Sequence, residues 1–155
     1  MDSPRALADQ EFATIVRLAP LVSIDLIIRD DGGNVLVGVR NNEPAKNFYF
    51  VPGGRVRKGE TLAAAFARIL AAETGCSVDF DAARFVGVYQ HIYPTNMFGD
   101  RGYGTHYVVL AYELNLNPRP AIVLDGQHRI AKWMSEAEVR AAPNVHPNTK
   151  AYFGA

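Results

Sequence analysis

The stretch GGRVRKGETLAAAFARILAAETGC, residues 53–76, constrains the fold of this chain more than any other. Two glycines open it, and a segment with helical periodicity follows at 61–75. Thr61 is the predicted N-cap, because its hydroxyl can accept a hydrogen bond from a free amide of the first turn. Gly75 is the predicted C′ residue, because glycine adopts the left-handed conformation that ends many helices. The stretch therefore predicts a helix with a defined start and end, preceded by flexible glycines.

One face of this helix carries a carboxylate where an apolar side chain is expected. At about 100° per residue, Phe66, Ile69 and Glu73 fall within roughly 40° of Leu62. Glu73 thus lies on the apolar, inward-facing stripe, where a carboxylate is costly unless it is paired or coordinated. Two interpretations stay open: the helix end frays and exposes Glu73 to solvent, or a cation or buried arginine lies opposite it.

A cation opposite Glu73 would be a hard one. The glycine-rich segment just before the helix offers backbone carbonyl oxygens as further ligands. Oxygen ligands without clustered cysteine or histidine favour magnesium, calcium or manganese over zinc.

Length and composition predict one domain, residues 1–155, with an ordinary soluble core, since 48% of the residues are hydrophobic and 21% are charged. Lys plus Arg and Asp plus Glu number 16 each, so the chain has no net positive charge that would attract nucleic acid or an acidic membrane. The single cysteine, Cys76, excludes an internal disulfide and fits a reducing compartment. Without a signal peptide or an 18-residue apolar run, the chain is expected to be cytoplasmic.

The order of predicted elements is α-β-β-β-α-β-β-(β)-α. It predicts an α/β (α+β) fold with a mixed sheet and helices packed on its faces. The helices are expected within 7–20, 61–75 and 135–142, the strands within 21–30, 34–40, 48–54, 84–93, 106–116 and 121–134, and a tail after them.

The pattern in 54–76 resembles the Nudix hydrolase box, G-x5-E-x7-R-E-U-x-E-E-x-G-U, where U is a bulky apolar residue. Ile69 and Ala72 stand in place of two of its glutamates, and Cys76 takes the final apolar slot. The resemblance implies an α/β/α sandwich around a mixed sheet, with the box as a loop-helix-loop. The matching positions are Gly54, Glu60, Arg68, Leu70, Glu73 and Gly75.

Beyond the box, most of the chain is similar to the GDP-mannose mannosyl hydrolase branch of that superfamily. The similarity thins at 115–125 and just after His128, where Arg129-Ile130-Ala131 takes the place of a more acidic stretch of the branch. The stretches that carry it are EFATIVRLAPLVSIDLII, GVRNNEPA, FVPGGRV, GVYQHIY, THYVVL, QH before Lys132-Trp133, and NVHPNTKAYF.

This resemblance implies hydrolysis of GDP-mannose, with GDP-glucose a second candidate, to GDP and free hexose. Water attacks the anomeric carbon with inversion, and His128 is the implied general base. One Mg²⁺ per active site, or Mn²⁺, is implied, held by the Gly53 carbonyl, Glu73 and Gln127. With only Glu73 left of the glutamate cluster, the multi-metal attack on phosphorus used by other Nudix enzymes is not expected.

The resemblance also implies how the substrate is held. Arg40 and Arg55 match arginines that face the diphosphate, a role that suits the planar guanidinium. Arg68 matches the box arginine, which orients a carboxylate or approaches the substrate. The implied contacts to sugar or diphosphate are Asp25, His91 and Tyr107, and the candidate to stack on guanine is Phe12.

Structural readings compete with several of these roles. Asp25 lies on an apolar strand and is either exposed at a sheet edge or directed inward, and alternation does not decide between the two. His91 and His106 are equally consistent with hydrogen-bonded core histidines. Glu60 is a candidate to connect the loop to the helix, and His146 is a candidate helix cap or a residue of the tail.

Two other functions are compatible with the sequence. One is a conventional Nudix pyrophosphohydrolase that attacks phosphorus, and the other is a non-catalytic nucleotide-sugar binding module on a degenerate box. The expected partner is a GDP-sugar, without nucleic acid or membrane, and the resemblance implies a homodimer.

Overall fold

The computed structural model of the chain describes residues 7–119 and 128–154, with the backbone alone at 128–130. The predicted mixed α/β fold is confirmed. Its elements are α1 (Asp9–Leu18), β1 (Leu21–Arg29), β2 (Val35–Arg40), β3 (Tyr49–Phe50), β4 (Gly53–Arg55), α2 (Leu62–Thr74), η1 (Phe80–Ala82), β5 (Arg84–Tyr93), β6 (Thr105–Asn115), β7 (His128–Met134), α3 (Glu136–Ala141), α4 (Pro147–Lys150) and η2 (Ala151–Phe153).

Within the described residues the strands form one seven-stranded mixed sheet, ordered β3-β2-β1-β6-β5, with β4 paired to β1 and β7 to β2. β1 runs parallel to β6 along its whole length, and the other pairings are antiparallel. β1 is therefore the central strand, which explains why its sequence is almost continuously apolar.

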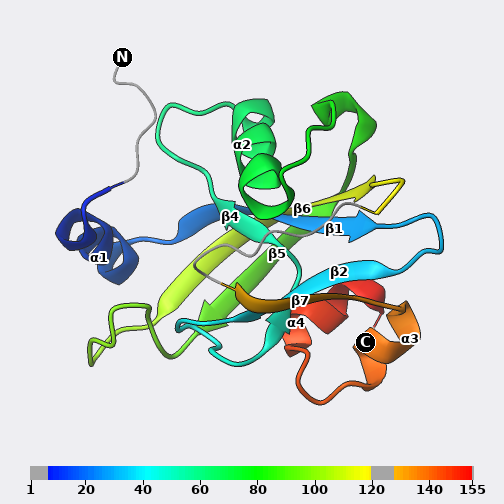
Figure 1. Ribbon diagram of the computed structural model, residues 1–155. Helices are drawn as coiled ribbons and strands as arrows, with labels where there is room; N and C mark the ends of the chain where they lie inside the picture. The colour runs from blue at the N-terminus through cyan, green and yellow to red at the C-terminus, as the bar shows by residue number, and fades with distance from the viewer. Residues whose placement is uncertain (1–6, 120–127, 155) are drawn as a thin grey trace.

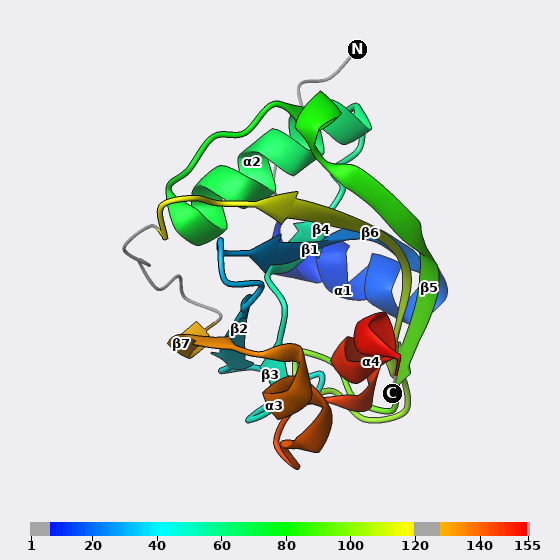
Figure 2. The ribbon, with the colours of Figure 1, turned by 90° about the vertical axis from the view of Figure 1, so that its right-hand side faces the viewer.

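Helices cover both faces of the sheet (Figures 1 and 2): α2 packs on one face, and α3 and α4 pack on the other. The core is accordingly split by the alternation of β1. Ile24, Leu26 and Ile28 belong to a cluster with Phe66 of α2. Ile27 belongs to the opposite cluster, which contains Val139, Val145 and Phe153 from the C-terminal segment. Asp25, in the same alternation as Ile27, faces the C-terminal helices.

The helix of the box is α2, and it begins and ends at the residues that the sequence predicts. Thr61 Oγ1 accepts a hydrogen bond from the Ala64 amide, and Gly75 adopts the left-handed conformation with φ 73°, so both predicted ends are confirmed. Phe66 and Ile69 are buried as expected, whereas Leu62, the first residue of the helix, is 39% exposed. Glu73 is half-buried.

Two other expectations about local structure are wrong. Residues 48–54 are not one strand with flexible glycines at its end, because the chain forms β3 and β4, and the glycines of β4 pair with β1. The segment after 135–142 is not only a tail, and 135–142 is not the terminal helix. α4 and η2 fold back against the sheet and bury Phe153. None of the helices in the described ranges is long and apolar enough to cross a membrane.

Candidate functional site

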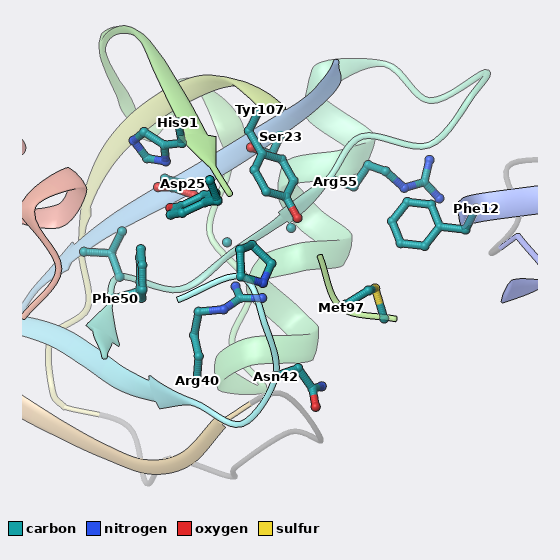
Figure 3. A pocket seen from close by; sticks show the side chains of 15 residues that line it. Phe12, Ser23, Asp25, Arg40, Asn42, Phe50, Arg55, His91, Met97 and Tyr107 are labelled. Carbon is teal, nitrogen blue, oxygen red and sulfur yellow. The ribbon is translucent and has the colours of Figure 1, made fainter. Parts of the chain in front are cut away.

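A pocket of about 180 Å³ opens where β2 diverges from β1. The two strands pair only at Arg29 and Val35, and β4 pairs with β1 further along, at 23–25. Figure 3 shows side chains from these strands converging on the pocket with others from α1, β5 and β6. The lining residues are Phe12, Ser23, Asp25, Arg40, Asn42, Pro44, Phe50, Val51, Gly53, Gly54, Arg55, His91, Tyr93, Met97 and Tyr107.

Six residues assigned to substrate binding from the sequence come from distant parts of the chain and line this one pocket, together with the expected metal ligand Gly53. They are Phe12, Asp25, Arg40, Arg55, His91 and Tyr107.

Asp25 lies at the inner end of the pocket, on the central strand and not at an edge. The Tyr152 hydroxyl donates a hydrogen bond of 2.5 Å to Asp25 Oδ2. The other oxygen, Oδ1, lies over Gly53, where a Cβ would approach it to 2.4 Å. Burial raises the pKa of Asp25 to about 6, against the opposing effects of the Tyr152 hydrogen bond and the Arg40 charge. Only glycine at position 53 leaves room for this carboxylate.

His91 is a second buried polar group of the pocket. It is 5% exposed, and its Nε2 has no hydrogen-bond partner among the described residues. Burial, with a smaller effect from His146, lowers the pKa of His91 to about 4. The imidazole is therefore neutral at physiological pH, and Nε2 is available to a ligand.

Arg40 and Arg55 supply the positive charge of the pocket. The Arg40 guanidinium lies 5.7 Å from the centre of the Phe50 ring, and that of Arg55 lies 5.0 Å from the centre of the Phe12 ring. Neither makes an ion pair within the described part of the chain. Burial and the nearby charges of Arg57 and Arg68 lower the pKa of Arg55. Two such guanidinium groups can bind the oxygens of a diphosphate.

Arg68, unlike Arg40 and Arg55, does not line the pocket. Its Nε and Nη2 each donate to the Glu60 carboxylate at 2.8 Å, and Nη2 also donates to the Arg55 carbonyl at 2.8 Å. Glu60 Oε1 accepts from the Arg57 amide at 2.7 Å. The Arg68 hydrogen bond is the main reason that the pKa of Glu60 is lowered. Arg68 thus orients a carboxylate and connects α2 to β4 and the loop.

Two of the three expected metal ligands lie within the described residues. Leu26 N donates to Pro52 O, and Val56 N donates to Val22 O. This alternation puts Gly53 in a non-hydrogen-bonded position, so its carbonyl is not used by β1. Glu73 is half-buried and lies one turn beyond Ile69, the residue that packs on Gly54. Two oxygen donors suit a hard cation such as Mg²⁺, and Gln127, the third, lies outside the described residues.

The two box glutamates that a multi-metal site would need are replaced by a buried isoleucine and an exposed alanine. Ile69 is 2% exposed and packs against Gly54 so closely that a Cβ there would lie 3.0 Å from Ile69 Cγ1. Ala72 is exposed. In the part of the chain that the structure describes, no three His, Cys, Asp or Glu side chains are grouped as metal ligands.

His128 begins β7, and its backbone pairs with that of Arg40 at a register shift. This pairing brings the backbone of the expected general base to the strand end that supplies Arg40 to the pocket. The side chain of His128 lies outside the described residues.

Sequence reasoning assigned no role to Tyr152, Tyr93 or Ser23. Tyr152 falls in NVHPNTKAYF, in which His146 followed by Pro147 is the only signal of a helix start. The structure confirms His146 as a cap: its Nδ1 accepts from the Asn148 amide at 3.0 Å. Tyr93 and Ser23 line the pocket on alternating strand positions, a pattern that does not distinguish site residues from core residues.

The fold and the box define the chain as a Nudix protein. Residues 19–153 match the NUDIX domain family, and the chain belongs to that family. Nudix hydrolases generally use divalent metal ions such as Mg²⁺.

The low-salt glycan biosynthesis protein Agl8 of Haloferax volcanii is 38% identical over 151 residues, which cover 96% of this chain and 90% of that protein. The fold is similar to that of the MutT NUDIX hydrolase of Burkholderia pseudomallei, with a TM-score of 0.69, 23% identity, and 86% and 95% of the two chains covered. It is also similar to the NUDIX domain of Shewanella oneidensis NrtR, solved with ADP ribose, with a TM-score of 0.65, 18% identity, and 94% and 95% covered.

Proposed function

We propose that this protein hydrolyses a GDP-sugar, GDP-mannose first, to GDP and free hexose by attack of water at the anomeric carbon with inversion. The observation that carries the proposal is the packing of Ile69 on Gly54. A buried isoleucine occupies the position at which the Nudix box has a glutamate, so the box lacks the carboxylates for a multi-metal attack on phosphorus. Attack at carbon does not need them, because diphosphate is already a good leaving group.

The charges of the pocket support two subsites. Arg40 and Arg55 suit the diphosphate, whose negative charge increases as the bond to the sugar breaks. Asp25 and His91 suit sugar hydroxyls, because a carboxylate accepts hydrogen bonds from hydroxyls but repels phosphate oxygens. The name of the relative Agl8, which refers to glycan biosynthesis, agrees with a sugar-containing substrate.

In the proposed reaction the water oxygen bonds to the anomeric carbon, and the bond from that carbon to the diphosphate oxygen breaks. The electron pair of that bond leaves with GDP. His128 accepts the proton of the attacking water, a role suited to an imidazole that titrates near neutral pH. Gly53, Glu73 and Gln127 would hold one Mg²⁺ per site, and the bound ion would neutralise charge on the leaving diphosphate.

The test is a product assay with GDP-mannose and Mg²⁺ in oxygen-18 water. GDP and mannose, with the label in mannose, are expected. GMP and mannose 1-phosphate, with the label in phosphate, would show a conventional Nudix pyrophosphohydrolase and overturn the proposal. Tight binding without turnover would show a nucleotide-sugar binding module and overturn it as well.

The role of His128 has its own matched pair of variants. His128→Gln is expected to lower kcat by about 100-fold or more, the usual contribution of a general base. His106→Gln is the control, because His106 is half-buried on β6 and does not line the pocket. Equal rates for the two variants would exclude His128 as the base.

A further inference from the structure

We propose that Tyr152 is a positioning residue that fixes the Asp25 carboxylate for the sugar. The inference rests on the proposed function, since it takes a GDP-sugar as the ligand. Tyr152 lies in η2, and its hydroxyl reaches Asp25 across 127 positions of the chain. The C-terminal segment thereby contacts a residue of the pocket without lining the pocket itself.

The position of Tyr152 is set by the anchoring of the residues around it. Phe153, its neighbour, is buried in the core, and its carbonyl accepts a hydrogen bond of 3.2 Å from Arg140 Nη1. The Arg29 guanidinium lies 5.6 Å from the centre of the Phe153 ring. Because the backbone at 153 is fixed in this way, the Tyr152 hydroxyl is a preorganised donor and not a mobile surface group.

The hydrogen bond assigns different roles to the two oxygens of Asp25. Oδ2 accepts from Tyr152, and Oδ1 lies beside Gly53 on the pocket wall. A tyrosine hydroxyl has one proton to donate, and it is used here. Oδ1 therefore stays available to accept from a sugar hydroxyl, and the rotation of the carboxylate about χ2 is restricted.

The ring of Tyr152 supports the same wall. It packs edge-on against Tyr89, with ring centres 4.7 Å apart, and its centre lies 6.2 Å from that of His91. Replacing Tyr152 by phenylalanine keeps these ring contacts and removes only the hydrogen bond. Tyr152→Phe is thus a specific test of positioning, and Tyr89→Phe is the matched control, because Tyr89 does not line the pocket.

The experiment compares the binding of GDP-mannose and of GDP by calorimetry in Tyr152→Phe, Asp25→Asn and the double variant. All are made in a His128→Gln background and measured in EDTA without Mg²⁺, so that neither attack at carbon nor a metal-dependent attack at phosphorus consumes the substrate. Tyr152→Phe is expected to weaken GDP-mannose binding about tenfold, the usual effect of losing a hydrogen bond to a charged group. GDP binding is expected to stay unchanged and shows that the rest of the pocket is intact.

The double variant separates positioning from a general structural effect. If Tyr152 acts through Asp25, Tyr152→Phe causes no further loss in the Asp25→Asn background. Losses that add, equal losses for GDP and GDP-mannose, or a loss as large in Tyr89→Phe would each overturn the inference. The measurement is of binding, so it stands even if the product assay shows attack at phosphorus or no turnover. A failure of the proposed function is thus distinguishable from a failure of this inference.

Discussion

Ile69, in the middle of α2, is in direct contact with Gly54 of β4: a Cβ at position 54 would lie 3.0 Å from Ile69 Cγ1 and 3.3 Å from its Cδ1. The contact joins α2 to β4, the strand that contributes Gly53 and Arg55 to the pocket. The residue that replaces a box glutamate is therefore part of the core. Its side chain now stabilises the position of the strand that carries site residues.

Restoring the glutamate should accordingly destabilise the protein. Ile69→Glu is expected to lower the free energy of unfolding by about 3 kcal/mol, because it buries a carboxylate against apolar neighbours. Urea denaturation in EDTA measures the change without a metal contribution. Ala72→Glu, at the other altered box position, is the control, since Ala72 is exposed and a change within about 0.5 kcal/mol is expected there. A stable Ile69→Glu would show that the side chain finds solvent.

Gly53 should not tolerate a side chain. In Gly53→Ala the new Cβ would lie 2.8 Å from the Ile24 carbonyl oxygen and 2.4 Å from Asp25 Oδ1. Since the backbone oxygen belongs to the central strand and cannot move freely, we expect a loss of about 2–3 kcal/mol in thermal or urea unfolding. Gly87→Ala on β5 is the matched control, because its nearest neighbour would be a Tyr89 ring atom at 3.6 Å. Equal stability of the two variants would contradict the structure at position 53.

Asp25 should make stability depend on pH. Its pKa is raised by burial from 3.8 to about 6, so the folded state holds the proton more tightly than the unfolded state. The carboxyl therefore contributes stability that is fully present below about pH 3.8 and is lost as the pH rises through about 6.

Asp25→Asn removes this dependence. Relative to the wild type, the variant should gain about 2.5 kcal/mol between pH 4 and pH 7.5, measured by urea denaturation in EDTA. Asp81→Asn, at an exposed position, should show no such gain. A stability difference between Asp25→Asn and wild type that is the same at both pH values would contradict the raised pKa.

The contribution of Arg68 to stability should depend on the geometry of its planar guanidinium group and not on its charge alone. Arg68→Lys keeps the charge but cannot make the three hydrogen bonds to Glu60 and to the Arg55 carbonyl. A loss of about 2 kcal/mol in the free energy of unfolding is expected. Arg84→Lys is the control: that side chain is 66% exposed and pairs with Glu113 at the surface, where the change should be below about 1 kcal/mol. Equal effects would show that the Arg68 network is not structural.

Local signals in the sequence were sufficient to predict most of the helices and strands. The helix from Leu62 to Thr74 has its predicted cap and its predicted left-handed glycine, and β5 spans the predicted 84–93. Periodicity, capping and turn residues act between positions a few residues apart, so they can be read from the chain. The resemblance selected six residues that the fold brings to one pocket.

Tertiary structure alone decided the features that depend on distant partners. Gly53 and Gly54 look like a flexible turn in the sequence, but pairing with β1 makes them a strand. Alternation could not tell whether Asp25 is exposed at a sheet edge or directed inward. Pairing with β4 and β6 on its two sides places it away from an edge, and its side chain lines the pocket. Tyr152 gave no local signal, because its role depends on a contact with a residue at the other end of the chain. Short-range periodicity determines elements, whereas long-range pairing determines which side chains meet.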